Sequence, residues 1–208
     1  MTAIIDYGVG NLFSLCSSFE KIGEPACVTR NPAVIRSADR LVLPGVGAFR
    51  DAAEKLFSSG LDKVLLEEVS KGKPVIGVCL GMQLLFEKSY EYGEYKGLGL
   101  IKGSIRPIAE VCGDLKIPQM GWNSLTFRNG RHPLFKYISE GDHVYFVHSY
   151  YGAECEADTI AVTEYGAPVT AAVAHENVMG CQFHPEKSGE TGLSILRAFC
   201  EMKEGSLC

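Results

Sequence analysis

The sequence predicts an α/β fold with an open, mostly parallel twisted sheet, flanked by helices and extended by antiparallel strands in its C-terminal half. In the first half, short β-like runs alternate with helix-like stretches, which is the pattern of βαβ units around a parallel sheet. In the second half, strand-like runs follow one another closely, as antiparallel additions to that sheet would. The length of 208 residues and the 46% hydrophobic composition suit one globular domain, which we expect to span residues 1–208.

The first half contains four β-like runs and four helix-like stretches. The runs lie at residues 3–6, 25–29, 40–43 and 74–78, and the helix-like stretches at 12–22, 49–57, 61–71 and 82–88. Asn11 precedes the first helix and is a residue type that caps helices. Because ligands gather outside the carboxyl ends of the strands in open α/β sheets, the residues that directly follow each run are candidates for a site.

The second half is predicted to form strands at residues 115–127, 143–148, 159–162, 169–174 and 178–183. Between the two halves, the segment 88–103 is rich in glycine and tyrosine and is expected to be a surface loop. The last helix is expected over residues 189–203, because Leu193, Leu196 and Phe199 recur at helical spacing. Ser188 is placed to cap that helix.

The charge and the cysteines exclude several classes of function. A net charge of −5, with the 20 basic residues scattered, argues against binding to nucleic acid or to an anionic membrane. No stretch has the pattern of a signal peptide or a membrane span, so we expect a soluble cytoplasmic protein. The eight cysteines lie far apart without any C-x-x-C pair, so we expect neither a disulfide framework nor a metal, and no cofactor is indicated.

Cys79 is the candidate nucleophile. It lies in the sequence Gly77-Val78-Cys79-Leu80-Gly81, between an apolar run and a helix-like stretch. In this G-x-C-x-G pattern the nucleophile occupies a sharp turn, and the flanking glycines let neighbouring backbone approach. The amides of a helix N-terminus would favour its thiolate. By itself the pattern is compatible with a protease, an esterase-like hydrolase or a redox thiol.

Two further segments supply groups that an activated thiol needs. In Pro44-Gly45-Val46-Gly47, backbone amides could form an oxyanion hole, or the loop could merely start the next helix. In His184-Pro185-Glu186, residues two apart in an extended segment face the same side, so Glu186 could orient His184 as the base for Cys79. His148, which ends another strand, is a second-rank candidate for the base.

Together, residues 44–47, 77–83 and 184–186 resemble the signature of the triad (class I) glutamine amidotransferases, a family with a flavodoxin-like fold. Residues 6–11, 96–101, 117–123, 147–150 and 184–188 are similar to those members that serve as glutaminase subunits of imidazole glycerol phosphate synthases. The resemblance covers essentially the whole chain. It implies that Cys79 attacks the side-chain amide of L-glutamine, that His184 protonates the departing ammonia, and that Glu186 orients His184.

The resemblance also implies roles for residues around the triad. The backbone amide of Leu80 and one amide of the segment Gly45, Val46 and Gly47 would form the oxyanion hole. Gln83, with the backbone of Ser149 and Tyr150, would hold the amino acid end of glutamine.

A partner is implied as well, because a single glutaminase domain does not use the ammonia that it releases. In the family this partner is a (β/α)8 barrel cyclase, which forms a heterodimer with the glutaminase. The residues that would line the docking face are Asn11, Met120, Trp122, Tyr145 and Lys187. The alternative is that Met120 and Trp122 fill the core. Gln119 departs from the histidine that many relatives carry there, which puts any role of that side chain in doubt.

Two rival functions remain open from the sequence. One is a glutaminase subunit of another class I amidotransferase, for pyridoxal phosphate or aminodeoxychorismate synthesis. The segments 121–123 and 184–188 weigh against it. The other is a regulatory protein on the same fold that has lost catalysis, although all three triad residues are present.

Overall fold

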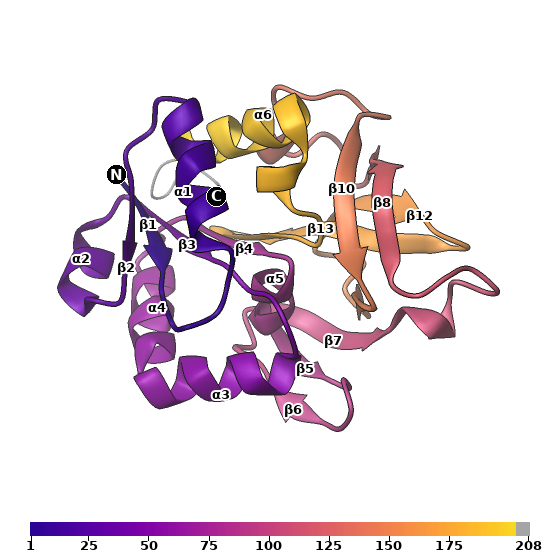
Figure 1. Ribbon diagram of the computed structural model, residues 1–208, viewed down its shortest axis with the longest axis horizontal. Coiled ribbons are helices and arrows are strands. Elements are labelled where there is room, and N and C mark those ends of the chain that lie inside the picture. The colour runs from indigo at the N-terminus through magenta and orange to yellow at the C-terminus, as the bar shows by residue number, and fades with distance from the viewer. Residues whose placement is uncertain (203–208) are drawn as a thin grey trace.

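The main feature of the computed structural model, which describes residues 1–202, is an eight-stranded sheet with the strand order β2-β1-β3-β4-β14-β13-β12-β9 (Figure 1). Its first five strands are parallel: β1 (Thr2–Ile5), β2 (Ala26–Thr29), β3 (Arg40–Leu43), β4 (Val75–Val78) and β14 (Val178–Cys181). Every residue of β1, β4 and β14 is buried, as expected for strands that are covered on both faces.

The other three strands of the main sheet are antiparallel. They are β9 (Thr126–Phe127), β12 (Thr159–Glu164) and β13 (Pro168–His175). The strand β14 is therefore the junction, because it pairs in parallel with β4 and antiparallel with β13. The predicted fold class is confirmed by this sheet.

Two smaller sheets were not predicted. In one, β8 (Gln119–Ser124) pairs with β10 (His143–His148), so these strands do not extend the main sheet as expected. The other has the strand order β11-β7-β5-β6 and consists of β5 (Phe86–Ser89), β6 (Tyr95–Lys96), β7 (Ile101–Pro107) and β11 (Tyr150–Ala153). The prediction of a loop over 88–103 is wrong. The strand β5 pairs with both β6 and β7 in this part of the chain, and β7 also pairs with the distant β11.

Helices cover both faces of the main sheet. The helices are α1 (Leu12–Lys21), α2 (Pro32–Ser37), α3 (Phe49–Ser59), α4 (Leu61–Ser70), α5 (Leu80–Leu85) and α6 (Gly189–Cys200). Side chains alternate along β1: Ala3 and Ile5 pack with residues of α2, α3 and α4, whereas Ile4 packs with residues of α1 and α6. Three 3-10 turns complete the chain: η1 (Ile108–Glu110), η2 (Pro133–Phe135) and η3 (Pro185–Lys187).

Some predicted boundaries and caps differ from the structure. The helix expected over 82–88 ends at Leu85, and the chain continues as β5. Asn11 and Ser188 do occupy N-cap positions, but neither side chain makes a capping hydrogen bond. The last helix ends at Cys200, and Lys203, included in the prediction, lies outside the described residues. Within residues 1–202, no helix has both the length and the apolar character needed to cross a membrane.

Candidate active site

Cys79 sits on a strained turn between β4 and α5. Its φ is 55° and its ψ is −113°, in a region that residues with a Cβ rarely adopt. A hydrogen bond of 2.8 Å from the Cys79 amide to the carbonyl oxygen of Cys181 holds the turn to β14. A Cβ at Gly81 would overlap the carbonyl oxygen of Leu43, so a side chain there would push α5 away from the sheet. The structure thus has a sharp strand-to-helix turn at Cys79, as the G-x-C-x-G pattern predicts, and its strain is typical of functional sites.

The segment 44–47 lies directly against this turn. A Cβ at Gly45 would come within 2.6 Å of the Gly81 amide nitrogen, which shows how closely the two backbones approach. Gly47 has a φ of +90°, and Val46 is 44% exposed. Val46, Gly47 and Leu80 line the same cavity as Cys79. The structure therefore brings the candidate oxyanion segment to the candidate nucleophile.

His184 and Glu186 form a buried ion pair, but not in the way that the sequence suggested. His184 Nδ1 and Glu186 Oε1 are 2.8 Å apart, and the two side chains are only 4% and 1% exposed. Glu186 lies in the 3-10 turn η3 rather than on an extended strand. Pro185 starts that turn, so the chain bends back and brings Glu186 to the ring of His184. The pairing is confirmed, whereas the two-residue strand periodicity is the wrong reason for it.

The two histidines nearest the site have opposite charge preferences. Burial lowers the pKa of His184, but hydrogen bonds with Cys79 and Glu186 outweigh burial and raise it to about 9. Burial lowers the pKa of His148 to about 4, against a 2.8 Å contact between its Nδ1 and the Tyr150 carbonyl oxygen. At neutral pH His184 is therefore an imidazolium and His148 is uncharged. His184 contacts Cys79, whereas the hydrogen-bond contact of His148 is with the Tyr150 carbonyl oxygen, so His184 remains the favoured candidate.

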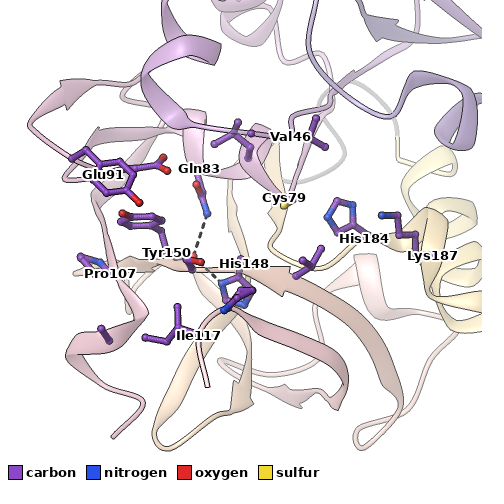
Figure 2. Close-up of a pocket in the computed structure, with 17 residues that line it drawn as sticks. Val46, Cys79, Gln83, Glu91, Pro107, Ile117, His148, Tyr150, His184 and Lys187 are labelled. Atoms are coloured by element: carbon purple, nitrogen blue, oxygen red, sulfur yellow. Dashed lines mark hydrogen bonds between the residues drawn. The ribbon is translucent and has the colours of Figure 1, made fainter. Parts of the chain in front are cut away.

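The cavity in front of Cys79 has a volume of about 570 Å³ (Figure 2). Gln83 reaches into it from α5 and donates a hydrogen bond of 3.2 Å from Nε2 to the Tyr150 carbonyl oxygen. Ser149 and Tyr150 also line it, as the sequence predicted. Within residues 1–202, no group of three or more His, Cys, Asp or Glu side chains is arranged to hold a metal ion.

The sequence did not identify two residues of this site, Gln182 and Glu91. Gln182 is fully buried, and its Nε2 lies 3.7 Å from the sulfur of Cys79. The only available signal was its position two residues before His184. Glu91 lines the cavity, and its Oε2 accepts a hydrogen bond of 2.6 Å from the amide of Phe49, the first residue of α3. No local pattern indicated Glu91, because its surroundings were predicted to be a loop.

The residues expected at a docking face lie in four places: the N-cap of α1, β8, β10 and η3. Met120 and Trp122 lie on one side of β8 and are 62% and 54% exposed, so the alternative that they fill the core is wrong. Tyr145 faces Trp122 across the β8–β10 pair, with ring centroids 6.0 Å apart. Its carbonyl oxygen accepts a 2.9 Å hydrogen bond from the His184 amide, which connects this face to the triad. Asn11 is half-buried.

Lys187 is the one residue of the expected docking face that lines the cavity among the described residues. Gln119 points away from that face. It is fully buried and donates a hydrogen bond of 3.1 Å to the side chain of Asn123. The departure from histidine at this position therefore changes the interior rather than the exposed surface.

Comparison with known proteins adds three findings. Residues 3–202 match the family model described as glutamine amidotransferase class-I. The chain is 48% identical to the imidazole glycerol phosphate synthase subunit HisH of Oceanobacillus iheyensis, over 97% of this chain and 99% of that protein. It is 49% identical to the protein of the same name from Caldanaerobacter subterraneus, over 97% and 98%.

Among solved structures, one described as a glutamine amidotransferase superposes with a TM-score of 0.75. The match covers 96% of this chain and 97% of that one at 17% sequence identity. At that identity the likeness shows the shared fold.

Proposed function

The chain belongs to the class-I glutamine amidotransferase family, with the HisH subunits of imidazole glycerol phosphate synthase, and on this premise we propose that Cys79, His184 and Glu186 hydrolyse L-glutamine. The observation that carries the proposal is the buried His184–Glu186 pair at the same cavity as the strained Cys79. The chain is the glutaminase of a histidine biosynthetic enzyme, which decides against the rival glutaminase subunits. The intact triad supports a catalytic role rather than a purely regulatory one.

The first half of the reaction is acyl transfer to sulfur. The Cys79 thiolate attacks the side-chain carbonyl carbon of glutamine, and the carbonyl oxygen becomes an oxyanion. We propose that the amide of Leu80 and an amide of the Gly45–Gly47 segment stabilise it, each such donor lowering the barrier by about 3 kcal/mol in acyl-transfer sites. His184, an imidazolium at neutral pH, gives its proton to the leaving nitrogen. Ammonia departs and a glutamyl thioester remains.

The second half is hydrolysis of the thioester. His184, now neutral, removes a proton from a water molecule that attacks the thioester carbonyl. The carbon–sulfur bond breaks, glutamate leaves and the Cys79 thiolate is restored beside the imidazolium. Glu186 holds Nδ1 of His184 throughout, so that Nε2 is the nitrogen that exchanges protons.

The amino acid end of glutamine fits the part of the cavity that is farthest from His184. There Gln83, Tyr150 and Glu91 offer an amide, a carbonyl oxygen and a carboxylate (Figure 2). Both hydrogens of the Gln83 NH2 group are donated to Tyr150 and Gln182. Gln83, Tyr150 and Glu91 therefore present acceptor oxygens that can bind the ammonium of glutamine. The cavity volume of about 570 Å³ is within the range of small-molecule sites.

The ammonia is used by a partner, which we propose to be a (β/α)8 barrel cyclase. This cyclase converts a phosphorylated ribulosyl aminoimidazole carboxamide into imidazole glycerol phosphate and an aminoimidazole carboxamide ribotide. The exposed Met120 and Trp122, beside the strand whose Tyr145 carbonyl holds the His184 amide, support a docking face here. Cyclase binding at this face would act on the triad through β10. Lys187, of the expected docking face, lines the cavity.

The test compares synthesis that uses glutamine as the nitrogen source with synthesis that uses added ammonium salts. In the complex reconstituted with the cyclase, Cys79→Ala should abolish synthesis from glutamine and leave synthesis from added ammonium salts intact. Cys27→Ser, which changes a cysteine on β2 away from the site, is the matched control and should preserve both activities. Loss of both activities in Cys79→Ala, or retention of both, would contradict the proposed role of Cys79.

A further inference from the structure

Gln182 lies between the glutamine pocket and the nucleophile, and no step of the proposed reaction uses it. Its side chain is fully buried just after β14. Its amide oxygen accepts a hydrogen bond of 3.0 Å from Gln83 Nε2, and its amide nitrogen lies 3.7 Å from the sulfur of Cys79. One buried amide thus contacts a pocket residue on one side and the reacting atom on the other.

The Tyr150 carbonyl oxygen can only accept a hydrogen bond, and this fixes the orientation of the Gln83 and Gln182 side-chain amides. The Tyr150 carbonyl oxygen lies 3.2 Å from the side-chain nitrogen of Gln83, so that end of the Gln83 amide must be the NH2 group. The same NH2 group faces Gln182, which must present its carbonyl oxygen in return. Rotating the Gln182 amide by 180° would set two donors against each other. The NH2 group of Gln182 is therefore directed to the Cys79 sulfur.

We propose that Gln182 is a further catalytic residue, whose side-chain amide donates a hydrogen bond to the Cys79 sulfur and stabilises the thiolate. A thiol sulfur accepts hydrogen bonds weakly, whereas an anionic acceptor accepts them strongly. The donor also favours the second half of the reaction, because a neutral thioester sulfur is a poor acceptor and the bond is regained when the thiolate leaves. This inference rests on the proposed role of Cys79 as the nucleophile.

The titratable groups around the sulfur do not replace this donor. Burial raises the pKa of Tyr7, and the nearby Cys79 adds to the effect. Burial also raises the pKa of Cys181, with further contributions from Glu186 and Cys79. Both groups therefore stay neutral in the physiological range, and each donates its hydrogen elsewhere: Tyr7 to the Pro44 carbonyl oxygen at 2.6 Å and Cys181 to the Gly77 carbonyl oxygen at 3.8 Å. His184 supplies the positive charge, while Gln182 does not titrate, and its hydrogen bond is stronger when the sulfur is a thiolate.

The experiment measures how fast iodoacetamide alkylates Cys79 between pH 5.5 and 10, followed through the mass of the Cys79 peptide. Gln182→Met keeps the size of the side chain and removes the donor. At pH 6.5 we expect about tenfold slower alkylation, equivalent to about 1.4 kcal/mol. At pH 10 the rate should equal or exceed that of the unmodified protein, because a thiolate without a donor is the stronger nucleophile.

Two further variants complete the design. Gln182→Glu keeps the acceptor for Gln83 but turns an acceptor towards the sulfur, so alkylation at pH 6.5 should be slower than in Gln182→Met. Gln119→Met changes another fully buried glutamine, with no contact to the sulfur among its hydrogen bonds, and should leave the profile unchanged. Equal unfolding midpoints in urea verify that the variants are folded.

A pH profile of Gln182→Met that coincides with the unmodified protein would overturn the inference. So would a rate lowered by the same factor at every pH, since that is the result of a purely structural role. Alkylation requires neither glutamine nor the cyclase, so this outcome is separate from a failure of the Cys79→Ala test, which would remove the proposed function itself.

Discussion

Two buried ion pairs lie at opposite ends of the parallel strands. Lys73 precedes β4 and pairs with Glu68 of α4, and their side chains are 8% and 3% exposed. His184 follows β14, which runs parallel to β4, and pairs with Glu186 at similarly low exposure. Both pairs join a cation to a carboxylate at similarly low exposure. They differ in the other hydrogen bonds that their side chains make.

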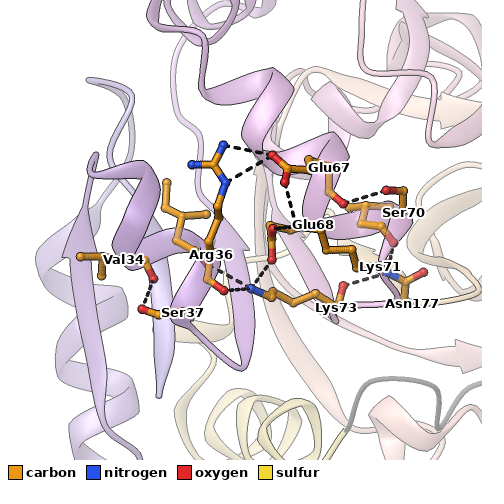
Figure 3. Close-up of polar contacts among 11 residues, drawn as sticks. Val34, Arg36, Ser37, Glu67, Glu68, Ser70, Lys71, Lys73 and Asn177 are labelled. Carbon is orange, nitrogen blue, oxygen red and sulfur yellow. Dashed lines mark hydrogen bonds and ion pairs between the residues drawn. The ribbon is translucent and has the colours of Figure 1, made fainter.

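The Lys73 pair uses all the donors of its ammonium (Figure 3). Besides the contact with Glu68, Lys73 Nζ donates to the carbonyl oxygens of Ile35 at 3.1 Å and Arg36 at 2.7 Å. Glu68 accepts a second hydrogen bond of 2.7 Å from Lys71. Such a saturated pair connects α2, α4 and the start of β4 and leaves no group available for a ligand.

The His184 pair is less saturated. Among residues 1–202, Oε2 of Glu186 has no hydrogen-bond partner, and Nε2 of His148 close by has none either. A buried polar atom without a partner costs stability, so the open acceptor of Glu186 leaves this pair less stabilised by hydrogen bonds than the Lys73 pair. Hydrogen-bond saturation, rather than burial, therefore distinguishes the Lys73 pair from the His184 pair, for which we propose a catalytic role.

The strongest test of this comparison is Glu186→Gln. The amide can still contact His184, but it does not stabilise the imidazolium, so glutaminase activity of the complex should fall roughly 10²–10⁴-fold. The urea midpoint at neutral pH should fall as well, because the raised pKa of His184 adds stability that the contact with Glu186 helps to supply. Full activity in this variant would show that Glu186 is no more than structural.

At the other end of the sheet, a change in the Lys73 pair should affect stability rather than activity. Lys73→Met leaves Glu68 buried without its main partner, which should lower the free energy of unfolding by about 3 kcal/mol in urea titrations. The kcat for glutamine in the folded complex should not change. Lys71→Met is the matched control and should have a much smaller effect, because Lys71 is exposed to water.

The surfaces at the two ends can be compared in the same way. Trp122→Ala should weaken binding to the cyclase about 30-fold, or about 2 kcal/mol, as aromatic residues at the centre of an interface do. Leu66→Ala on α4 removes a side chain that is 36% exposed near the other pair and should leave the affinity unchanged. Both are measured by titration calorimetry. Equal affinities for the two variants would remove Trp122 from the docking face.

The smallest effect concerns pH. Because the folded-state pKa of His184 is raised to about 9 from an ordinary value of 6.5, its stabilising contribution is complete below pH 6.5 and is lost as the pH rises through 9. Its role as acid is lost in the same range, so glutaminase activity should decline about tenfold per pH unit above 9. In Glu186→Gln the decline should begin at lower pH, which pH profiles of kcat/KM would detect. A decline that starts at the same pH in both proteins would contradict the contribution of Glu186.

Much of the fold and the triad could be predicted from the sequence by itself. Runs such as 74–78 are apolar throughout because both faces are covered, and this local pattern is enough to predict parallel strands. The spacing around Cys79 requires glycines where backbones touch, so the turn could be read from residue types alone. The identities of Cys79, His184 and Glu186 follow from that chemistry together with the family resemblance.

Only the tertiary structure decided which segments meet. Glu186 reaches His184 through a 3-10 turn, β8 and β10 form their own sheet, and Gln182 contacts a cysteine that is 103 residues away in sequence. Local patterns report whether a segment is buried or exposed, but they carry no information about its partner. The contacts that orient Gln182 and saturate Lys73 join distant elements, so they exist only once the sheet has assembled.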